Sequence, residues 1–230
     1  MSRSIVISLY DFTGEALKPW AKAVYSCYAF DIQHPKEGRV DQGICYQHAD
    51  LHDHNTLNSI HSGFIEKPVV FGMAFPVCTD LAVSGAMHFK KKKQADPLFQ
   101  YKAMQHVFDC ANTFIKMKCT YMIENPVSVL ATMWREPDYR FHPYEYGGYI
   151  PEDQAEHPVW PEYIAPRDAY PKKTCLWTDY RFVMPPMLPV EPEQGFSRQH
   201  LKLGGKSART KNIRSATPRG FARAVMEANV

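Results

Sequence analysis

The stretch Phe71-Gly-Met-Ala-Phe-Pro-Val-Cys-Thr-Asp-Leu-Ala-Val-Ser-Gly85 decides how the rest of the chain is organised. It continues an apolar run from Val69 to Phe75 that is short and rich in β-branched and aromatic residues, which is typical of a buried strand. Pro76 ends this strand, and Cys78 follows in a stretch rich in turn-forming residues. The pattern therefore predicts a cysteine just beyond the end of a buried strand.

A second apolar run, Thr120-Tyr-Met-Ile123, ends in the same way, in Glu124-Asn125-Pro126. If both strands belong to one parallel sheet, their carboxyl ends face the same crevice, which is where α/β folds bind their ligands. We therefore expect a thiol and a carboxyl group to share one pocket.

This pair of groups suits one reaction. C5 of cytosine is a poor nucleophile until a group adds to C6 of the ring and converts it into an enamine. A thiolate can make that addition, and an acid beside N3 of the ring offsets the developing negative charge.

At these residues the chain resembles the cytosine-5 DNA methyltransferases, which carry Pro-Pro-Cys and Glu-Asn-Val motifs at the two strand ends, and it looks like the short forms carried by bacteriophages. The resemblance runs from about Ile5 to Asn229. It implies a Rossmann-like class I S-adenosylmethionine-dependent methyltransferase fold, α/β with a mostly parallel sheet and helices on both faces. It also implies catalytic roles for Cys78, Glu124 and Asn125.

The N-terminal part has the strand–turn–helix–strand pattern of dinucleotide-binding folds. Ile5–Tyr10 is the first predicted strand, Leu17, Trp20, Ala21 and Val24 follow at helical spacing, and the second predicted strand runs from Val24 to Phe30 and ends at Asp31. A third short strand covers residues 43–46. By resemblance, S-adenosylmethionine binds here and leaves as S-adenosylhomocysteine, held by Tyr10, Asp11, Phe12, Thr13, Gly14, Asp31, Ile32, Asp50, Leu51, Pro76 and Thr217.

Two further segments contain candidate functional residues. Lys172–Trp177 resembles the strand in which the family carries Gln-x-Arg-x-Arg, and Lys173 takes the place of the arginine that holds cytosine O2, although a lysine lacks the planar arginine fork. The histidines of residues 48–61 (His48, His52, His54 and His61) admit a metal-binding interpretation, but polar loops also collect histidines and the reaction needs no metal, so we expect none.

Charge is distributed unevenly along the chain. The net charge of +3 hides a segment, Arg198 to Arg223, with eight Lys or Arg residues and no acid; outside it 19 basic residues stand against 24 acidic ones. A basic segment on an acidic body indicates binding to a polyanion, here DNA, and the alternative is a solvated flexible tail. Lys90–Lys93 form a second basic run, which either contacts a DNA phosphate or is simply solvated.

A chain of 230 residues accommodates one α/β domain, and we expect residues 1–230 to form a single catalytic domain. Within it, residues 134–171 form an insertion rich in proline and aromatic residues, whose rings either stack on bases or fold the segment on itself. Residues 178–213 leave room for only a reduced or absent target-recognition region. Residues 214–230 resemble the closing helix of the family, which packs near the first strand, and an amphipathic helix is expected after Asp96-Pro97, with apolar positions from Tyr101 to Ile115.

Composition adds limits. No apolar run approaches the roughly 20 residues of a membrane helix, and no signal peptide is apparent, so we expect a cytoplasmic monomer, in the host cytoplasm if a phage encodes it. The six cysteines show no zinc spacing and should be reduced. Two functions remain: a DNA cytosine-5 methyltransferase, or a non-catalytic relative that binds nucleic acid or S-adenosylmethionine in a regulatory or anti-defence role. Formation of S-adenosylhomocysteine distinguishes them.

Overall fold

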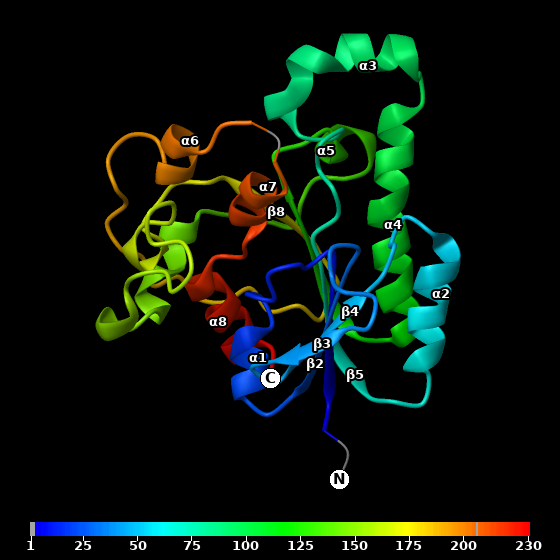
Figure 1. Cartoon of the computed structure of the whole chain (residues 1–230), viewed down its shortest axis with the longest axis horizontal. Helices are drawn as coiled ribbons and strands as arrows, with labels where there is room; N and C mark the ends of the chain where they lie inside the picture. The colour runs from blue at the N-terminus through cyan, green and yellow to red at the C-terminus, as the bar shows by residue number, and fades with distance from the viewer. Residues whose placement is uncertain (1–2, 206) are drawn as a thin grey trace.

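A computed structural model describes residues 3–205 and 207–230. At its centre is an eight-stranded sheet with the strand order β3-β4-β2-β1-β5-β6-β8-β7 (Figure 1). The strands are β1 (Ile5–Leu9), β2 (Ser26–Asp31), β3 (Arg39–Asp41), β4 (Ile44–His48), β5 (Val69–Ala74), β6 (Thr120–Pro126), β7 (Tyr139–Phe141) and β8 (Thr174–Thr178).

Five neighbouring strands, β4, β2, β1, β5 and β6, are parallel. β3 pairs with β4 in the antiparallel sense, and β8 runs antiparallel to both β6 and β7. The chain is thus an α/β protein with a mixed, mostly parallel sheet, compatible with a Rossmann-like fold. We call the edge at which the five parallel strands end the carboxyl edge.

Helices cover both faces of the sheet, as the sequence predicted (Figure 1). The apolar sides of α2 (His54–Gly63) and α4 (Phe99–Met117) pack on one face, and those of α1 (Lys18–Lys22) and α8 (Arg219–Ala228) pack on the other. The shorter helices are α3 (Phe89–Ala95), α5 (Leu130–Met133), α6 (Arg198–Lys202), α7 (Ala208–Ser215) and the 3₁₀ helices η1 (Val83–His88), η2 (Pro143–Tyr149), η3 (Glu152–Gln154) and η4 (Pro166–Asp168).

The second strand starts later than predicted. Val24 is neither in β2 nor on the buried side of α1: it is 56% exposed and has a left-handed φ of 70°. The physical reason is the turn that ends α1, in which the Tyr25 N–H donates to the Trp20 carbonyl at 3.1 Å and the residue before it must adopt a left-handed conformation.

The predicted helix after Asp96-Pro97 is α4, but it begins at Phe99, where the Asp96 carboxylate accepts from the Leu98 N–H at 3.0 Å. The prediction that its apolar stripe extends from Tyr101 to Ile115 is wrong at both ends, because these two side chains are exposed. The buried positions instead run from Phe99 to Phe114 and include Met104 and Val107. The histidine-rich stretch after β4 is also only partly a loop, because α2 begins at His54.

The aromatic segment 134–171 and the basic segment 198–223 pack against each other. Lys202 Nζ donates to the Glu162 carbonyl at 3.1 Å, Arg198 to the Pro161 carbonyl at 2.9 Å, and the Arg209 guanidinium lies 5.3 Å from the Tyr163 ring centre. Within the aromatic segment, Ile164, Ala165 and Tyr170 form a small apolar cluster with Trp160. The aromatic segment therefore folds on itself, and the basic segment is bound to the body of the protein at several points.

None of the described helices is both apolar enough and long enough to cross a lipid bilayer.

Candidate active site

The loops that follow β5 and β6 are joined into one unit at the carboxyl edge. Ala74 pairs with Ile123 in the sheet, so the next residues of both strands lie side by side. Beyond the strands, the Val129 N–H donates to the Leu81 carbonyl at 3.0 Å, and the Val83 N–H donates to the Val127 carbonyl at 3.0 Å. The chain around Cys78 and the chain around Glu124 thus form one wall, the arrangement predicted from the two strand ends.

Cys78 lies in a tight turn and is half-buried. Its carbonyl accepts hydrogen bonds from the N–H groups of Leu81 and Ala82, at 3.0 and 2.8 Å. Burial raises the pKa of the Cys78 thiol, the negative charge of Glu124 raises it further, and the positive charge of Lys172 lowers it in part. The resting thiol is therefore protonated, and its conversion to the thiolate requires either a base or additional positive charge.

Glu124 follows the last apolar residue of β6. Burial raises the pKa of its carboxyl group, and the nearby Lys172 ammonium offsets part of that rise. A carboxyl group that keeps its proton to higher pH than usual can donate a hydrogen bond or a proton to a ring nitrogen.

Asn125 is almost completely buried, and its side chain joins the two loops. Its Nδ2 donates to the Pro76 carbonyl at 3.2 Å, two residues before Cys78. Its Oδ1 makes no hydrogen bond within residues 3–205 and 207–230. Asn125 therefore acts on Cys78 through the backbone that carries it, which is a positioning role.

The two lysines before β8 lie in different environments. The charge of Lys172 acts on both Cys78 and Glu124, whereas Lys173 is exposed and its charge acts on Cys175. Lys172 Nζ also donates to the Arg214 carbonyl in α7 at 2.8 Å. The sequence analysis assigned Lys173 to the place of the arginine that holds cytosine O2. Only the course of the chain before β8 shows that Lys172, not Lys173, lies near Cys78 and Glu124.

The Cys78 turn also contacts the basic run of residues 90–93. Lys92 Nζ lies 2.5 Å from Asp80 Oδ1 and 3.2 Å from the Thr79 carbonyl oxygen. This contact anchors α3 to the turn directly after Cys78.

The loop after β1 is held together by Asp11. Its buried carboxylate accepts from Ser8 Oγ at 2.8 Å, from the Gly14 N–H at 2.7 Å and from Thr13 Oγ1 at 3.3 Å. Burial raises the pKa of Asp11 to about 6 despite these hydrogen bonds. Gly14 has a φ of +67°, and a Cβ atom there would lie 2.3 Å from the Tyr46 hydroxyl oxygen, so no larger residue fits.

Three of the predicted cofactor residues converge at the ends of β1, β2 and β4. Tyr10 donates from its hydroxyl to the Leu51 carbonyl at 2.9 Å; burial raises the pKa of this hydroxyl, and the negative charges of Asp50 and Asp31 add smaller contributions. Asp31 Oδ1 accepts from the Gln33 N–H at 2.8 Å. Asp50 is exposed, and of the remaining predicted residues Pro76, Leu51 and Thr217 are buried, Phe12 and Thr13 are half-buried, and Ile32 is exposed.

Two histidines that sequence reasoning missed adjoin this region. His34 is buried, its Nε2 lies 3.1 Å from the Asp11 carbonyl oxygen, and its ring stacks on Phe12. His106, on α4, stacks on His52 with ring centres 3.9 Å apart. His106 could not be found from the sequence, because it reaches the carboxyl edge only through the packing of α4. Among the described residues, no three His, Cys, Asp or Glu side chains are grouped as metal ligands.

The chain matches no protein-family model, and a comparison with curated proteins finds no relative.

Proposed function

We propose that the chain is an S-adenosylmethionine-dependent DNA cytosine-5 methyltransferase. The observation that carries the proposal is the single wall formed by the Cys78 turn and the Glu124 strand end, with Lys172 beside both groups. A thiol and a carboxyl group with a raised pKa at one sheet edge are the two groups that addition to C6 of cytosine requires.

The topology supports the finer fold assignment, a class I methyltransferase fold. In chain order, the parallel strands β4, β2, β1, β5 and β6 have the 3-2-1-4-5 arrangement of doubly wound nucleotide-binding sheets. In that arrangement the crevice opens where the strand order reverses, between β1 and β5. The loops after these two strands are those of Tyr10 and Cys78.

The residues at the ends of β1, β2 and β4 fit an adenosine-bearing cofactor. Asp31 uses Oδ1 for the Gln33 N–H, while its Oδ2 makes no hydrogen bond in the described part of the chain and is available to ribose hydroxyls. Asp50 lies close enough to Tyr10 to act on its hydroxyl and is exposed to an incoming adenine amino group. When bound, S-adenosylmethionine would supply the electrophilic methyl group.

The residues of the chain divide the reaction between them. The target cytosine must leave the DNA stack, which costs a few kcal/mol. Cys78 gives its proton to solvent and its sulfur bonds to C6, while Glu124 hydrogen-bonds or protonates N3, so that C5 becomes nucleophilic. After C5 is methylated, water takes the C5 proton, the electrons of that C–H bond re-form the C5–C6 double bond, and the C6–S bond breaks to release the thiolate. Any proton given to N3 returns to Glu124. Asn125 holds the Cys78 turn in place throughout.

The test is a covalent trap. In 5-fluorocytosine, fluorine replaces the C5 proton that the last step removes, and it cannot leave in the proton's place. Wild-type protein with S-adenosylmethionine and DNA containing 5-fluorocytosine should therefore form a denaturant-resistant adduct at Cys78, which mass spectrometry would locate. Cys78→Ala should form none. Glu124→Gln should form it on the order of 100-fold more slowly, which is the usual contribution of a general acid.

Cys45→Ala is the matched control, because Cys45 is also a half-buried free cysteine but lies in β4. It should form the adduct at the wild-type rate. An adduct mapped to Cys175 would reverse the assignment of the two strand ends.

One observation favours a second function. The raised pKa of Cys78 describes a thiol that rests in its unreactive form, as expected of a non-catalytic protein that binds DNA or S-adenosylmethionine. Under that function the wild-type protein binds both molecules but forms neither the adduct nor S-adenosylhomocysteine.

A further inference from the structure

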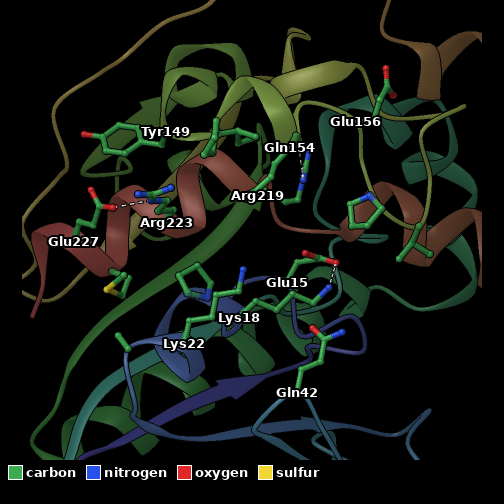
Figure 2. Close-up of a pocket in the computed structure, with 17 residues that line it drawn as sticks. Glu15, Lys18, Lys22, Gln42, Tyr149, Gln154, Glu156, Arg219, Arg223 and Glu227 are labelled. Atoms are coloured by element: carbon green, nitrogen blue, oxygen red, sulfur yellow. Dashed lines mark hydrogen bonds and ion pairs between the residues drawn. The ribbon is translucent and has the colours of Figure 1, made fainter.

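A large cavity lies away from the carboxyl edge, between α1, α8 and residues 149–159 (Figure 2). Its volume is about 810 Å³, within the range of pockets that bind small molecules. One wall includes Gln42, in the turn between β3 and β4, and another includes Ala23, which follows α1. Gln42 and Ala23 lie toward the edge opposite that of Cys78 and Glu124, whereas Glu15 and Arg219, which also line the cavity, follow Gly14 and Thr217 in the chain. Neither Cys78 nor Glu124 lines the cavity.

Two facing helices each present a pair of cations to this cavity. Lys18 and Lys22 come from α1, and Arg219 and Arg223 come from α8 (Figure 2). Lys18 pairs with Glu15 at 2.6 Å, and Arg223 pairs with Glu227 at 2.7 Å.

The other two cations, Lys22 and Arg219, make no ion pair within the described residues, although both line the cavity. The third lining acid, Glu156, is exposed, and its carboxylate points away from the lysines (Figure 2). The cavity lining therefore has uncompensated positive charge, on an exposed Lys22 and a half-buried Arg219.

Two buried N–H groups on the same side have no acceptor. Arg219 donates to the carbonyls of Gln154 and Ala155, at 3.1 and 2.8 Å, while its buried Nε has no hydrogen-bond partner in the described chain. His157 Nδ1 accepts from the N–H groups of Val159 and Trp160, so the ring proton is on Nε2, which is also buried and unpartnered, but His157 is not among the residues that line the cavity.

Burial and the charges of Arg219 and Lys18 lower the pKa of His157 to about 4, so its ring is neutral at physiological pH. Buried donors without acceptors are costly, and among the lining residues Arg219 Nε is such a donor. The positive charge nearby favours an anionic acceptor.

The rest of the lining is apolar. Pro19 and Met226 lie on the helix side, and Ile150, Pro151 and Val159 lie on the side of residues 149–159. A cavity with a cationic end and apolar walls suits a ligand with an anionic group on an apolar or aromatic body.

We propose that this cavity binds a small phosphate monoester, with its phosphate between Lys22 and Arg219 and its organic part against the apolar wall. A phosphate monoester provides several acceptor oxygens and close to two negative charges, which match the two unpaired cations. Duplex DNA is a poor occupant, because this site is concave and neither Cys78 nor Glu124 lines it.

Calorimetry on the full-length protein tests the proposal, with S-adenosylhomocysteine present to fill the proposed cofactor site. The probes are thymidine 5′-monophosphate, thymidine and inorganic phosphate. The monophosphate should bind with a dissociation constant below ~1 mM, and thymidine and inorganic phosphate should each bind at least ~10-fold more weakly. Lys22→Gln should weaken monophosphate binding by ~10-fold, the loss of one charge-assisted contact.

Lys67→Gln is the matched control, because Lys67 is an exposed lysine just before β5 and lies outside the cavity lining. It should leave the dissociation constant unchanged. Three results would overturn the proposal: monophosphate binding that Lys22→Gln does not weaken, equal affinity for thymidine or inorganic phosphate, and no saturable monophosphate binding. Loss of duplex-DNA affinity in Lys22→Gln would assign the cavity to DNA instead. None of these outcomes affects the Cys78 adduct, so the two proposals fail separately.

Discussion

At the scale of a single residue, the ionisation of Asp11 in the loop after β1 makes the folding stability of the protein depend on pH. Its pKa rises from an ordinary value of 3.8 to about 6 in the folded protein, because its carboxylate is buried. A raised folded pKa means that the contribution to stability is fully present below about pH 4 and is lost as the pH rises through 6. At pH 7 the ionised Asp11 therefore costs up to ~3 kcal/mol of folding free energy.

Asp11→Asn should remove this cost. Urea unfolding should give similar stability for both proteins near pH 4, and the variant should become more stable than wild type by ~1–3 kcal/mol above pH 6. Asp41→Asn, at an exposed site in β3, should show no such divergence. A gap between Asp11→Asn and wild type that stays constant across this pH range would mean that the folded pKa of Asp11 is not raised.

The prediction for cofactor binding concerns Asp31. Asp31→Ala removes the carboxylate offered to ribose hydroxyls and should weaken S-adenosylmethionine binding by roughly 1–3 kcal/mol, the cost of leaving buried hydroxyls unpaired. Isothermal calorimetry measures this directly, with Asp41→Ala as the exposed control. Unchanged affinity in Asp31→Ala would remove Asp31 from the site.

At the scale of elements, the contact between β5 and α4 fixes the position of β5, the strand that precedes Cys78. Gly72 in β5 lies under the Phe114 ring of α4, and a Cβ atom at residue 72 would lie 2.3 Å from a ring carbon. Gly72→Ala should therefore destabilise the protein by ~1–3 kcal/mol through overpacking, as measured by urea unfolding.

Phe114→Leu makes room for the added methyl group. The two substitutions together should cost ~1 kcal/mol less than the sum of their separate effects. Gly63→Ala is the control, because nothing lies within 4 Å of the place that its new methyl group would occupy and the residue ends α2, so stability should be unchanged or slightly higher. If the effects of Gly72→Ala and Phe114→Leu on the free energy of unfolding were strictly additive, β5 and α4 would adjust independently of each other.

For the whole molecule, two basic segments reach the carboxyl edge from different parts of the chain. α3 is anchored to the Cys78 turn by Lys92, and α7 adjoins the ends of β2 and β8 through the contacts of Asn212 with Gln33 and of Lys172 with the Arg214 carbonyl (Figure 1). DNA that lies across this edge would contact both. Because phosphate contacts release counterions, DNA affinity should fall steeply with salt.

Lys91→Gln with Lys93→Gln removes two exposed charges from α3 and should reduce the slope of log affinity against log salt by roughly 2. Lys67→Gln should leave the slope unchanged.

Residues 178–213 pack over the aromatic segment and form no apolar cluster of their own among the described residues, so few base edges can be read. Bisulfite sequencing of methylated plasmid should give a site of about two to four base pairs. A site of six or more specified bases would contradict this.

Local patterns in the sequence determined the elements and the neighbourhood of the site. Strand ends follow from apolar runs broken by proline or polar residues, and the carboxyl ends of adjacent parallel strands must meet, so Cys78 and Glu124 could be brought together from sequence alone. Amphipathic spacing marked the buried faces of α4 and α8 in the same way.

Contacts between distant residues were decided only by the tertiary structure. Asn125 reaches Pro76 across 49 positions, Lys172 rather than Lys173 reaches the reactive pair, and the basic segment binds the aromatic one through backbone carbonyls. The cavity between α1 and α8 likewise joins residues from both ends of the chain. Periodicity reports which face of an element is buried, but not which partner covers that face. That choice depends on how all the elements pack at once.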